Sequence, residues 1–360
     1  MQKKIIALAI AGLASTAAFA QTNVTIYGIA DASITATSNL GATNGQTGFK
    51  VNSGTLSTSR IGFKGVEDLG NGLKALFVLE YGLGIDVSQG IGYNATTPSA
   101  YARQQFVGLT GGFGTVVAGH LQTTGLDFTV AGSALGGSTG LGVAHSGAGL
   151  QAAAATHLIS ALQGGRHSNA VAYISPSFGG VTLAYNHARV TEGAGAGTGT
   201  LVSGGIAGTT DTHGDLLSAS YANGPITAGA IYTRVTVDGP NNNINEWGLR
   251  AGYDFGVVKL QGQYQRAKSQ ALPTVTTTGN ADSLWLVSAT VPVGAKVGVI
   301  AEFAHTSVKN SIAEDNVNAA TVAATYSLSK RTTAYTGVAA KRVQNSTDTN
   351  TYVLGLRHSF

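Results

Sequence analysis

The chain ends in Thr351-Tyr352-Val353-Leu354-Gly355-Leu356-Arg357-His358-Ser359-Phe360, a segment that alternates in polarity and stops on an aromatic residue. The side chains of a strand point to opposite faces in turn. One face therefore carries Tyr352, Leu354, Leu356, His358 and Phe360, and the other carries Thr351, Val353, Gly355, Arg357 and Ser359. The pattern predicts an amphipathic strand at the carboxy-terminus.

Residues 1–20 have the features of a secretory signal peptide. Lys3 and Lys4 precede the apolar run 5–13, and Ala18-Phe19-Ala20 forms a small-x-small cleavage site. The run is shorter than the roughly 18–20 residues that a spanning helix needs. We expect cleavage after residue 20, which leaves residues 21–360 as a single exported domain. An alternating strand follows at once, and a chain with strands at both ends can close its sheet into a barrel, which favours the outer membrane.

The composition excludes several classes of protein. Two of the 21 Lys and Arg lie in the signal peptide, so 19 remain against 17 Asp and Glu, a balance that argues against nucleic-acid binding. There is no Cys, which removes disulfides and thiolate zinc sites. The 51 Gly, the 6 Pro and the 11% charged residues suit many strands joined by glycine turns. The eight His show no metal-ligand spacing, and we expect no cofactor.

Seven short turn signals separate alternating segments. They are residues 69–72, 111–114, 178–180, 223–225, 254–256, 292–294 and 327–329. Two strands at each turn give fourteen, and the terminal pair brings the count to sixteen. Longer polar stretches lie between them, at residues 38–53, 87–100, 193–212, 239–244, 270–281 and 309–316. Short turns on one side and long loops on the other are typical of transmembrane barrels with an even number of strands.

The alternation also orients the strands. Trp247 and Leu249 oppose Arg250, and an Arg or Lys facing lipid at mid-membrane would cost about 2–4 kcal/mol, so Arg250 should face water in the interior. Tyr27, like Tyr352 and Phe360, suits a membrane interface. The segment 226–237 puts Tyr232 and Arg234 on one face and is not oriented by this argument. The predicted fold is all-β, a transmembrane 16-stranded antiparallel barrel with a wet interior.

One segment, 123–168, contains no convincing strand pair. Its Ala- and Leu-rich middle, residues 150–162, could form a short helix. It could be a disordered external loop. Alternatively it folds into the barrel, because a sixteen-stranded barrel has a lumen too wide to discriminate between solutes unless something narrows it.

Five stretches resemble hallmark segments of the trimeric general porins of Gram-negative outer membranes. They are Ser59–Ala75, Arg103–Leu109, Phe113–Val116, Tyr173–Gly180 and Tyr352–Phe360. The resemblance covers essentially the whole mature chain. It implies a homotrimer in outer-membrane lipid, an inward-folded third loop at residues 123–168, and passive diffusion of small hydrophilic solutes and ions. It also implies that the barrel-assembly machinery reads the end of the chain, at Phe360 and Tyr352, as an insertion signal.

The resemblance further implies a pore constriction in which basic residues of the wall face the third loop. The matching positions are Arg60, Arg103 and Arg166. Arg60 shares its strand face with Gly62 and Lys64, and so should point into water.

Arg103 shares its predicted face with Gln105, opposite Phe106. Lys64, Lys74 and His120 complete the candidate set, and His120 stands where the family has Arg. The alternative is that these cations form ordinary solvated pairs.

The charge of the loop distinguishes this chain from cation-preferring members of the family. No Asp or Glu lies between Asp127 and Glu192, whereas Arg166 and Arg189 do. Rings of Arg or Lys select anions, so we expect a preference for small anions.

Other functions have weaker support in the sequence. Gly136–Gly140 matches the G-x-S-x-G pattern of hydrolases around Ser138, but it lacks the strand-turn-helix setting, so no catalytic residue is predicted. A solute-specific outer-membrane channel, or a surface receptor or adhesin, is the nearer alternative.

Overall fold

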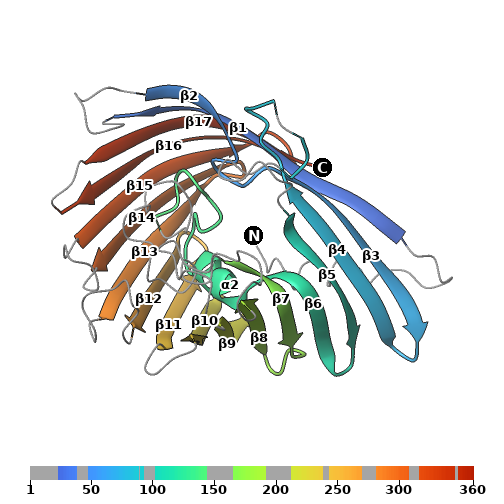
Figure 1. Cartoon of the computed structure of the whole chain (residues 1–360). Helices are drawn as coiled ribbons and strands as arrows, with labels where there is room; N and C mark the ends of the chain where they lie inside the picture. Colours follow the sequence, from blue (N-terminus) through green and yellow to red (C-terminus); the bar gives the residue numbers. More distant parts are fainter. Residues whose placement is uncertain are drawn as a thin grey trace.

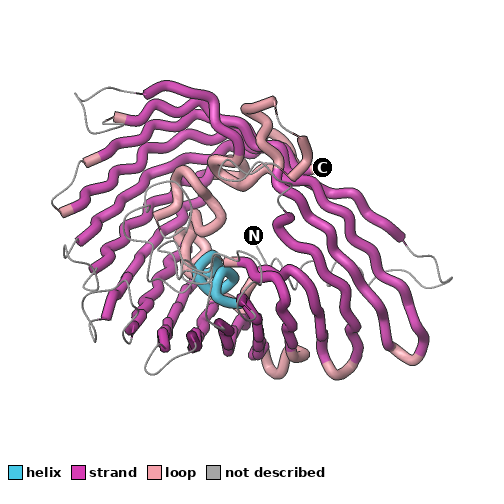
Figure 2. The backbone as a smooth tube through the Cα atoms, viewed as in Figure 1, coloured by secondary structure: helices cyan, strands magenta, loops and turns pink. Residues whose placement is uncertain are grey.

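A computed structural model describes residues 23–38, 48–88, 90–92, 102–143, 165–191, 212–237, 243–269, 281–307, 316–344 and 348–360. In these residues the chain forms one antiparallel sheet that curves around a central space (Figures 1 and 2), with the helix α2 on the inner side. No helix among the described residues is long and apolar enough to cross a membrane. The expected signal peptide and the expected helix at 150–162 lie outside these residues.

The elements follow one another with short connections at one end of the barrel. They are β1 (Asn23–Thr37), β2 (Gly48–Ser53), β3 (Arg60–Gly70), β4 (Leu73–Gly82), β5 (Ala102–Gly111), β6 (Gly114–Gln122), α2 (Thr124–Ala131), β7 (Arg166–Ile174), β8 (Val181–Thr191), β9 (Thr212–Asn223), β10 (Ile226–Val237), β11 (Asn243–Asp254), β12 (Lys259–Ser269), β13 (Ala281–Val293), β14 (Val297–Ser307), β15 (Asn316–Ser327), β16 (Thr332–Val343) and β17 (Thr349–Ser359).

The first and last strands pair with each other and close the sheet. β1 pairs with β17 from Ile29–Ser359 to Thr37–Thr351. β2 pairs with the loop-side half of β1, and β3 pairs with its turn-side half. β2 and β3 are therefore two parts of one barrel position, so the seventeen described strands form a closed antiparallel barrel of sixteen, as the sequence predicts.

All seven expected turns join the strands that they were expected to join. Gly70, Gly72, Gly114, Gly179, Gly180, Gly224, Gly256 and Gly294 have positive φ there, a region that favours glycine. One loop expectation needs correction. The stretch 38–53 was predicted as a loop, but Gly48–Ser53 forms β2, since its main chain pairs with β1.

Alternation along the strands separates an apolar outside from a polar inside. On β17 the Leu354 side chain is 61% exposed on the outside, while Val353 faces inward and is 3% exposed. On β11 Trp247 is 39% exposed, and Glu246 faces inward and is fully buried. The outward residues would meet lipid, which agrees with the orientation predicted from the cost of charge in the membrane.

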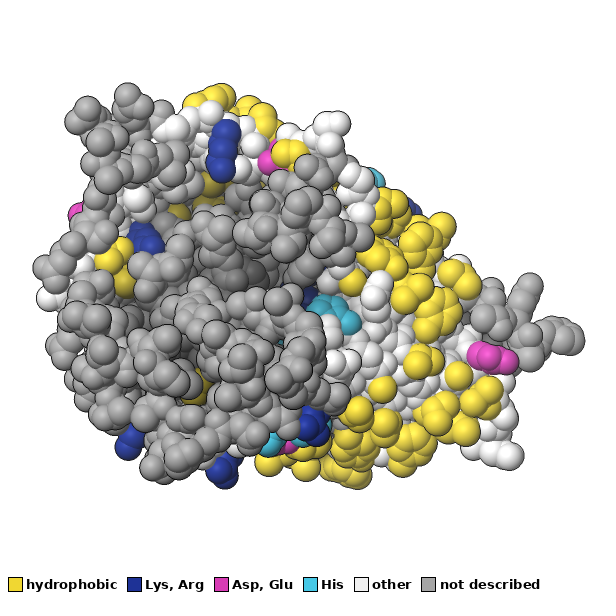
Figure 3. Space-filling model, viewed as in Figure 1, with side chains coloured by type: hydrophobic (Ala, Val, Ile, Leu, Met, Phe, Trp, Pro, Cys, Tyr) yellow, Lys and Arg dark blue, Asp and Glu magenta, His cyan; other side chains and the backbone are white. Residues whose placement is uncertain are grey.

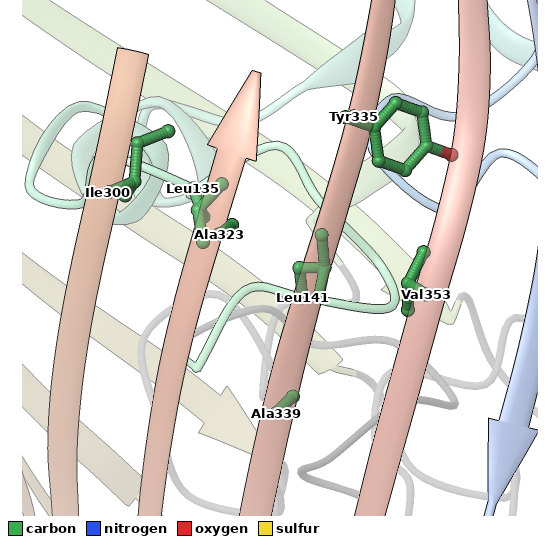
Figure 4. Close-up of a cluster of buried hydrophobic side chains, with 7 residues drawn as sticks. All are labelled: Leu135, Leu141, Ile300, Ala323, Tyr335, Ala339 and Val353. Carbon is green, nitrogen blue, oxygen red and sulfur yellow. The ribbon is translucent and has the colours of Figure 1, made fainter. Parts of the chain in front are cut away.

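The start of the third loop lies inside the barrel. Thr123 caps α2, because its Oγ1 accepts a hydrogen bond from the Leu126 N–H at 3.2 Å. Beyond α2 the chain reaches the wall formed by β14 to β17, where loop and wall side chains form one apolar cluster (Figure 4), made up of Leu135, Leu141, Ile300, Ala323, Tyr335, Ala339 and Val353. Burial of this cluster stabilises the inward course of the loop.

The closing seam should not tolerate a side chain at Gly28. A Cβ there would lie 2.5 Å from the Arg60 carbonyl oxygen and 2.4 Å from the Phe360 ring. Because the backbone cannot easily yield, we expect Gly28→Ala to lower the free energy of unfolding by about 1–3 kcal/mol, the usual range for overpacking. Urea unfolding in detergent measures this. Gly262→Ala is the matched control, since its Cβ would meet its nearest neighbour at 3.3 Å. If the two variants are equally stable, close packing at Gly28 does not contribute to the stability of the seam.

Candidate functional site

Residues 54–59, between β2 and β3, form a strand break. One buried carboxylate, that of Asp31, holds this strand break in shape. The Asp31 Oδ2 accepts hydrogen bonds from the N–H groups of Leu56 at 3.0 Å and Ser57 at 2.6 Å. Its Oδ1 accepts a hydrogen bond from the Tyr335 hydroxyl at 2.5 Å. The Gly54 N–H also donates to the Asp31 carbonyl at 2.8 Å. This strand break therefore has a defined conformation, although it leaves the β ladder.

The strand break binds the loop tip, which is residues 138–140 of the third loop. The Thr55 carbonyl accepts hydrogen bonds from Ser138 Oγ at 2.7 Å and from the Gly140 N–H at 3.1 Å. The Thr139 hydroxyl donates to the Gly54 carbonyl at 2.7 Å. Ser138, the serine of the G-x-S-x-G match, thus has a structural partner. A Cβ added at Gly140 would lie 2.6 Å from the Thr55 side chain, so the loop and the strand break are in close contact.

A second buried carboxylate, that of Glu302 on β14, binds residues of the third loop on both sides of the loop tip. Its Oε1 accepts hydrogen bonds from the Ser133 hydroxyl and from the Leu135 N–H, the latter at 2.8 Å. The Val143 N–H donates to Oε2 at 3.5 Å. The loop is therefore fixed at two points of the wall, and it lies inside the space that the strands enclose (Figure 2).

Two of the expected arginines meet on a third carboxylate, Glu80 of β4. The Arg103 Nε donates to Glu80 Oε1 at 2.8 Å, and the Arg60 Nη1 lies 3.9 Å from the same oxygen. The Tyr27 hydroxyl donates to Oε2 at 3.1 Å. The expectation that Tyr27 lies at the membrane interface is wrong, because β1 turns its side chain to the lumen.

Arg103 reaches the lumen for a reason that the sequence does not reveal. Its strand pairs Glu80 with Gln104 but Tyr81 with Ala102, so Arg103 is the extra residue of a β-bulge. The expected faces are therefore wrong for its neighbours. Gln105 lies on the outward face, where it donates to the Tyr81 hydroxyl, and Phe106 packs inward against the cluster that includes Leu76.

Arg166, at the start of β7, is linked to the base of α2. Its Nη2 donates to Gln122 Oε1 at 2.9 Å, and the Gln122 amide donates to Asp127 Oδ1 at 2.6 Å. Arg166 also interacts electrostatically with Glu80. Arg60, Arg103 and Arg166 thus share one region of the lumen beside the third loop.

The other candidates lie elsewhere. Lys64 faces the lumen and stacks its ammonium over the Tyr27 ring at 5.3 Å, four residues from Arg60 toward the turns. Lys74 pairs in register with Asp68 at the turn end of β4, about 20 Å along the strand from Glu80. His120 pairs in register with Gln105 on the outward face, and its Nδ1 lies 3.0 Å from Ser168 Oγ. The structure does not bring Lys74 to the three arginines, whereas His120 interacts electrostatically with one of them, Arg166.

Two further arginines face the lumen that were not in the candidate set. Arg250 of β11 donates to Ser220 Oγ at 3.1 Å, and its guanidinium lies 5.9 Å from the Phe128 ring of α2. Arg357 of β17 donates to Ser57 Oγ at 3.2 Å, beside the strand break. Because side chains alternate along each strand, the sequence already places Arg250 and Arg357 on inward faces. The sequence does not give the distance of these two arginines from the third loop.

The inner wall carries both acidic and basic side chains near the third loop. Four acidic residues of the wall, Asp31, Glu80, Glu246 and Glu302, are at most 4% exposed. Arg103, which pairs with Glu80, is 5% exposed, and the Arg60 side chain is 17% exposed. No group of three or more metal-ligating side chains occurs in the part of the chain that the structure describes.

Comparison with known proteins agrees with this geometry. The family model described as Gram-negative porin matches residues 7–346. The chain belongs to this porin family. It is consequently a channel of the Gram-negative outer membrane and not an enzyme.

Similar porins span the full chain. Outer membrane porin protein 32 of Delftia acidovorans is 30% identical over 389 residues, with both chains fully covered. An outer membrane porin protein of Bordetella pertussis is 27% identical over 404 residues, again with full coverage of both. Among solved structures, the anion-selective porin from Comamonas acidovorans has a TM-score of 0.74 and 26% identity, and the match covers 94% of this chain and 100% of that one.

The porin's loop tip should be loosened by removing its side-chain hydrogen bonds. Ser138→Ala with Thr139→Val deletes both hydroxyl donors to the strand break and keeps the side-chain volumes similar. We expect a larger and noisier single-channel conductance in planar bilayers, because the loop narrows the lumen only while it is held. Ser329→Ala, in a short turn far from the loop, is the control. An unchanged conductance in the double variant would show that these bonds do not set the aperture.

The porin's charge near α2 should depend on pH. Burial raises the pKa of the Asp127 carboxyl from 3.8 to about 6, against the opposing effects of the Gln122 hydrogen bond and the charges of Arg166 and Arg250. As the pH falls through about 6, the carboxylate takes up a proton and the lumen becomes more positive. We therefore expect anion preference to rise between pH 7.5 and pH 5.

Reversal potentials at the two pH values measure this effect. Asp127→Asn should show the higher anion preference already at pH 7.5 and should lose this part of the pH dependence. If the variant keeps the whole step, Asp127 is not its source.

Proposed function

We propose that this porin conducts small hydrophilic solutes by passive diffusion with a preference for anions. The observation that carries the proposal is the asymmetry of the inner wall. Two of its acids, Asp31 and Glu302, are enclosed in hydrogen bonds to Leu56, Ser57, Tyr335, Ser133 and Leu135, whereas Arg60, Arg103 and Arg166 lie beside the loop. The similar porin from Comamonas acidovorans is described as anion-selective, which supports the same direction.

The constriction is proposed to consist of Arg60, Arg103 and Arg166, with Lys64 on the path toward the turns. An anion at about 4 Å from one guanidinium gains roughly 1 kcal/mol in water, and several cations together favour anions before screening. Salt reduces this gain, because charges separated by more than about 8 Å are largely screened at 0.15 M. The Glu80 carboxylate lowers the net charge of the arginine pair, so the preference should be moderate.

Assembly is part of the same proposal. We propose that residues 1–20 are removed on export and that three copies form a homotrimer in outer-membrane lipid. The terminal Phe360 is proposed to be read, with Tyr352, by the barrel-assembly machinery. Its position supports this role, since both residues are exposed on the outer surface and Phe360 exchanges two main-chain hydrogen bonds of 3.1 Å with Gly28 at the seam.

Neutralising the arginines one at a time tests the selectivity. Arg60→Gln, Arg103→Gln and Arg166→Gln should each move the reversal potential in a salt gradient toward cations, by up to about fivefold in the permeability ratio if each charge contributes roughly 1 kcal/mol. Lys74→Gln is the control, because Lys74 lies at the turn end of the barrel. If no arginine variant moves the potential more than the control does, the constriction assignment is wrong.

A further inference from the structure

The two sides of β12 carry different chemistry. Apolar side chains cover much of the outer surface of the barrel, as Figure 3 shows for β3 to β6 at the right of the view, and the outward Leu260 of β12 is 46% exposed. Three successive residues of its inner side are glutamines, and we define Gln261, Gln263 and Gln265 as the glutamine ladder. Gln263 and Gln265 are 5% and 1% exposed. Buried amide groups need hydrogen-bond partners, and the ladder finds them on α2.

The glutamine ladder donates to the carboxyl-terminal end of α2. Gln265 Nε2 donates to Thr129 Oγ1 at 3.1 Å, and Gln263 Nε2 donates to the Thr129 carbonyl at 3.2 Å. Gln261 Nε2 donates to the Ala131 carbonyl at 3.0 Å. Three neighbouring side chains of one strand therefore bind one end of the helix.

α2 is too short to hold its own position. It has eight residues, and an isolated helix shorter than roughly 12–15 residues is only marginally stable in water. The last carbonyl groups of a helix also have no partner inside the helix. A Cβ added at Gly132, which follows α2, would lie 2.9 Å from Gln263 Cδ, so the helix end packs directly against the ladder. The wall therefore supplies the support that the short helix lacks.

The other end of α2 is also bound by neutral groups. The Thr124 N–H donates to Asn186 Oδ1 of β8 at 2.7 Å, and the Thr124 hydroxyl is hydrogen-bonded to the Ser218 hydroxyl of β9. An acceptor thus meets the amino-terminal end and donors meet the carboxyl-terminal end, as the helix dipole favours. Because amides and hydroxyls carry no net charge, they fix α2 without adding to the charge of the lumen.

One rung of the ladder continues across the wall as a row of polar side chains. In register, Gln261 lies across from Ser288, Ser288 from Glu302, and Glu302 from Thr321. Ser288 Oγ accepts a hydrogen bond from the Ala134 N–H at 3.2 Å, and Thr321 Oγ1 donates to a carbonyl of the third loop at 2.7 Å. Glu302 binds the loop as described above. The third loop therefore follows one row of the wall, and it enters that row at the glutamine ladder.

We propose that the glutamine ladder positions α2 in the lumen and thereby sets the largest solute that the pore passes. Its members are positioning residues, since they act through the helix. α2 carries Asp127, which is linked through Gln122 to Arg166, and Phe128, whose ring lies 5.9 Å from the Arg250 guanidinium. A displaced helix would change the distance across the pore at these arginines. The inference rests on the proposed diffusion of solutes and not on the anion preference.

Entry of neutral sugars into liposomes that contain the purified full-length mature protein tests the proposal, because uncharged solutes report the aperture and not the charge. Gln261→Leu/Gln263→Leu removes both amide donors to the helix carbonyls and keeps the side-chain volumes similar. One hydrogen bond shifts an equilibrium by about fivefold, so we expect a trisaccharide, measured relative to a monosaccharide, to enter at least about threefold faster than through the unmodified protein.

Gln105→Leu is the matched control. Gln105 also donates a side-chain hydrogen bond, to the Tyr81 hydroxyl at 2.9 Å, but it lies on the outward face of β5. The same substitution there should leave the ratio of the two entry rates unchanged. Monosaccharide entry at or above the unmodified rate reports a folded channel in each variant.

A double-mutant cycle tests whether the ladder acts through the helix. Thr129→Val and Gln265→Leu delete the same hydrogen bond from its two ends. Each should raise the relative entry of the trisaccharide, and the combination should raise it no further than the larger of the two, because the effects of groups in contact are not additive. Thr129→Ser keeps the hydroxyl and should behave as the unmodified protein does.

Failure of this inference differs from failure of the proposed function. If the unmodified protein admits no sugar at all, the diffusion of solutes is wrong and the inference falls with it. If the ladder variants admit the monosaccharide and keep the unmodified ratio, the ladder does not set the aperture, and the inference alone is overturned. Effects of Thr129→Val and Gln265→Leu that multiply would likewise overturn it, since the two side chains would then act separately.

Discussion

The pairing of every backbone N–H and C=O group across the membrane is the constraint on which this structure depends, because an unpaired group in hydrocarbon costs several kcal/mol. β1 and β17 meet for this reason, and the main chain of Phe360 completes the ladder at Gly28. At the break between β2 and β3 the ladder stops, and the carbonyls of Gly54 and Thr55 accept hydrogen bonds from the third loop instead. The need to pair backbone groups therefore closes the barrel and also positions the third loop inside it.

The charge of the lumen follows from how the wall uses its acids. A buried carboxylate is costly unless several donors satisfy it, and Asp31 and Glu302 each accept three hydrogen bonds from the strand break, the wall or the loop. These carboxylates hold the third loop and the strand break in place. Arginine keeps its charge and can extend a long side chain into the lumen. A nearly balanced composition can thus give a positive channel.

The turns and the alternation could be predicted because they depend on local chemistry, as at Asn71-Gly72 and Asn223-Gly224. The bulges could not, because a single extra residue reverses the faces that follow it. Counting alone assigned Gln105 to the lumen and Phe106 to lipid, and the bulge at Arg103 reverses both. A second register shift, between Gly119 and Leu121, lies beside His120. The helix α2 had a readable signal, the capping Thr123, but its place depends on the distant Asn186, whose side chain accepts a hydrogen bond from the Thr124 N–H.

Because neighbours on a strand face opposite sides, the charge of the pore and the charge of the outer surface are set independently. On β10 the buried Thr233 faces inward, while Arg234 is exposed on the outside. Arg234 is separated from the lumen by the wall, and its field falls off over about 8 Å at physiological salt. It should therefore add almost nothing to ion selectivity. Net charge, which is +4 for the whole chain, is for this reason a poor guide to what a porin conducts. The distribution of charge between the two faces, and the depth of each charged group along its strand, are what decide it.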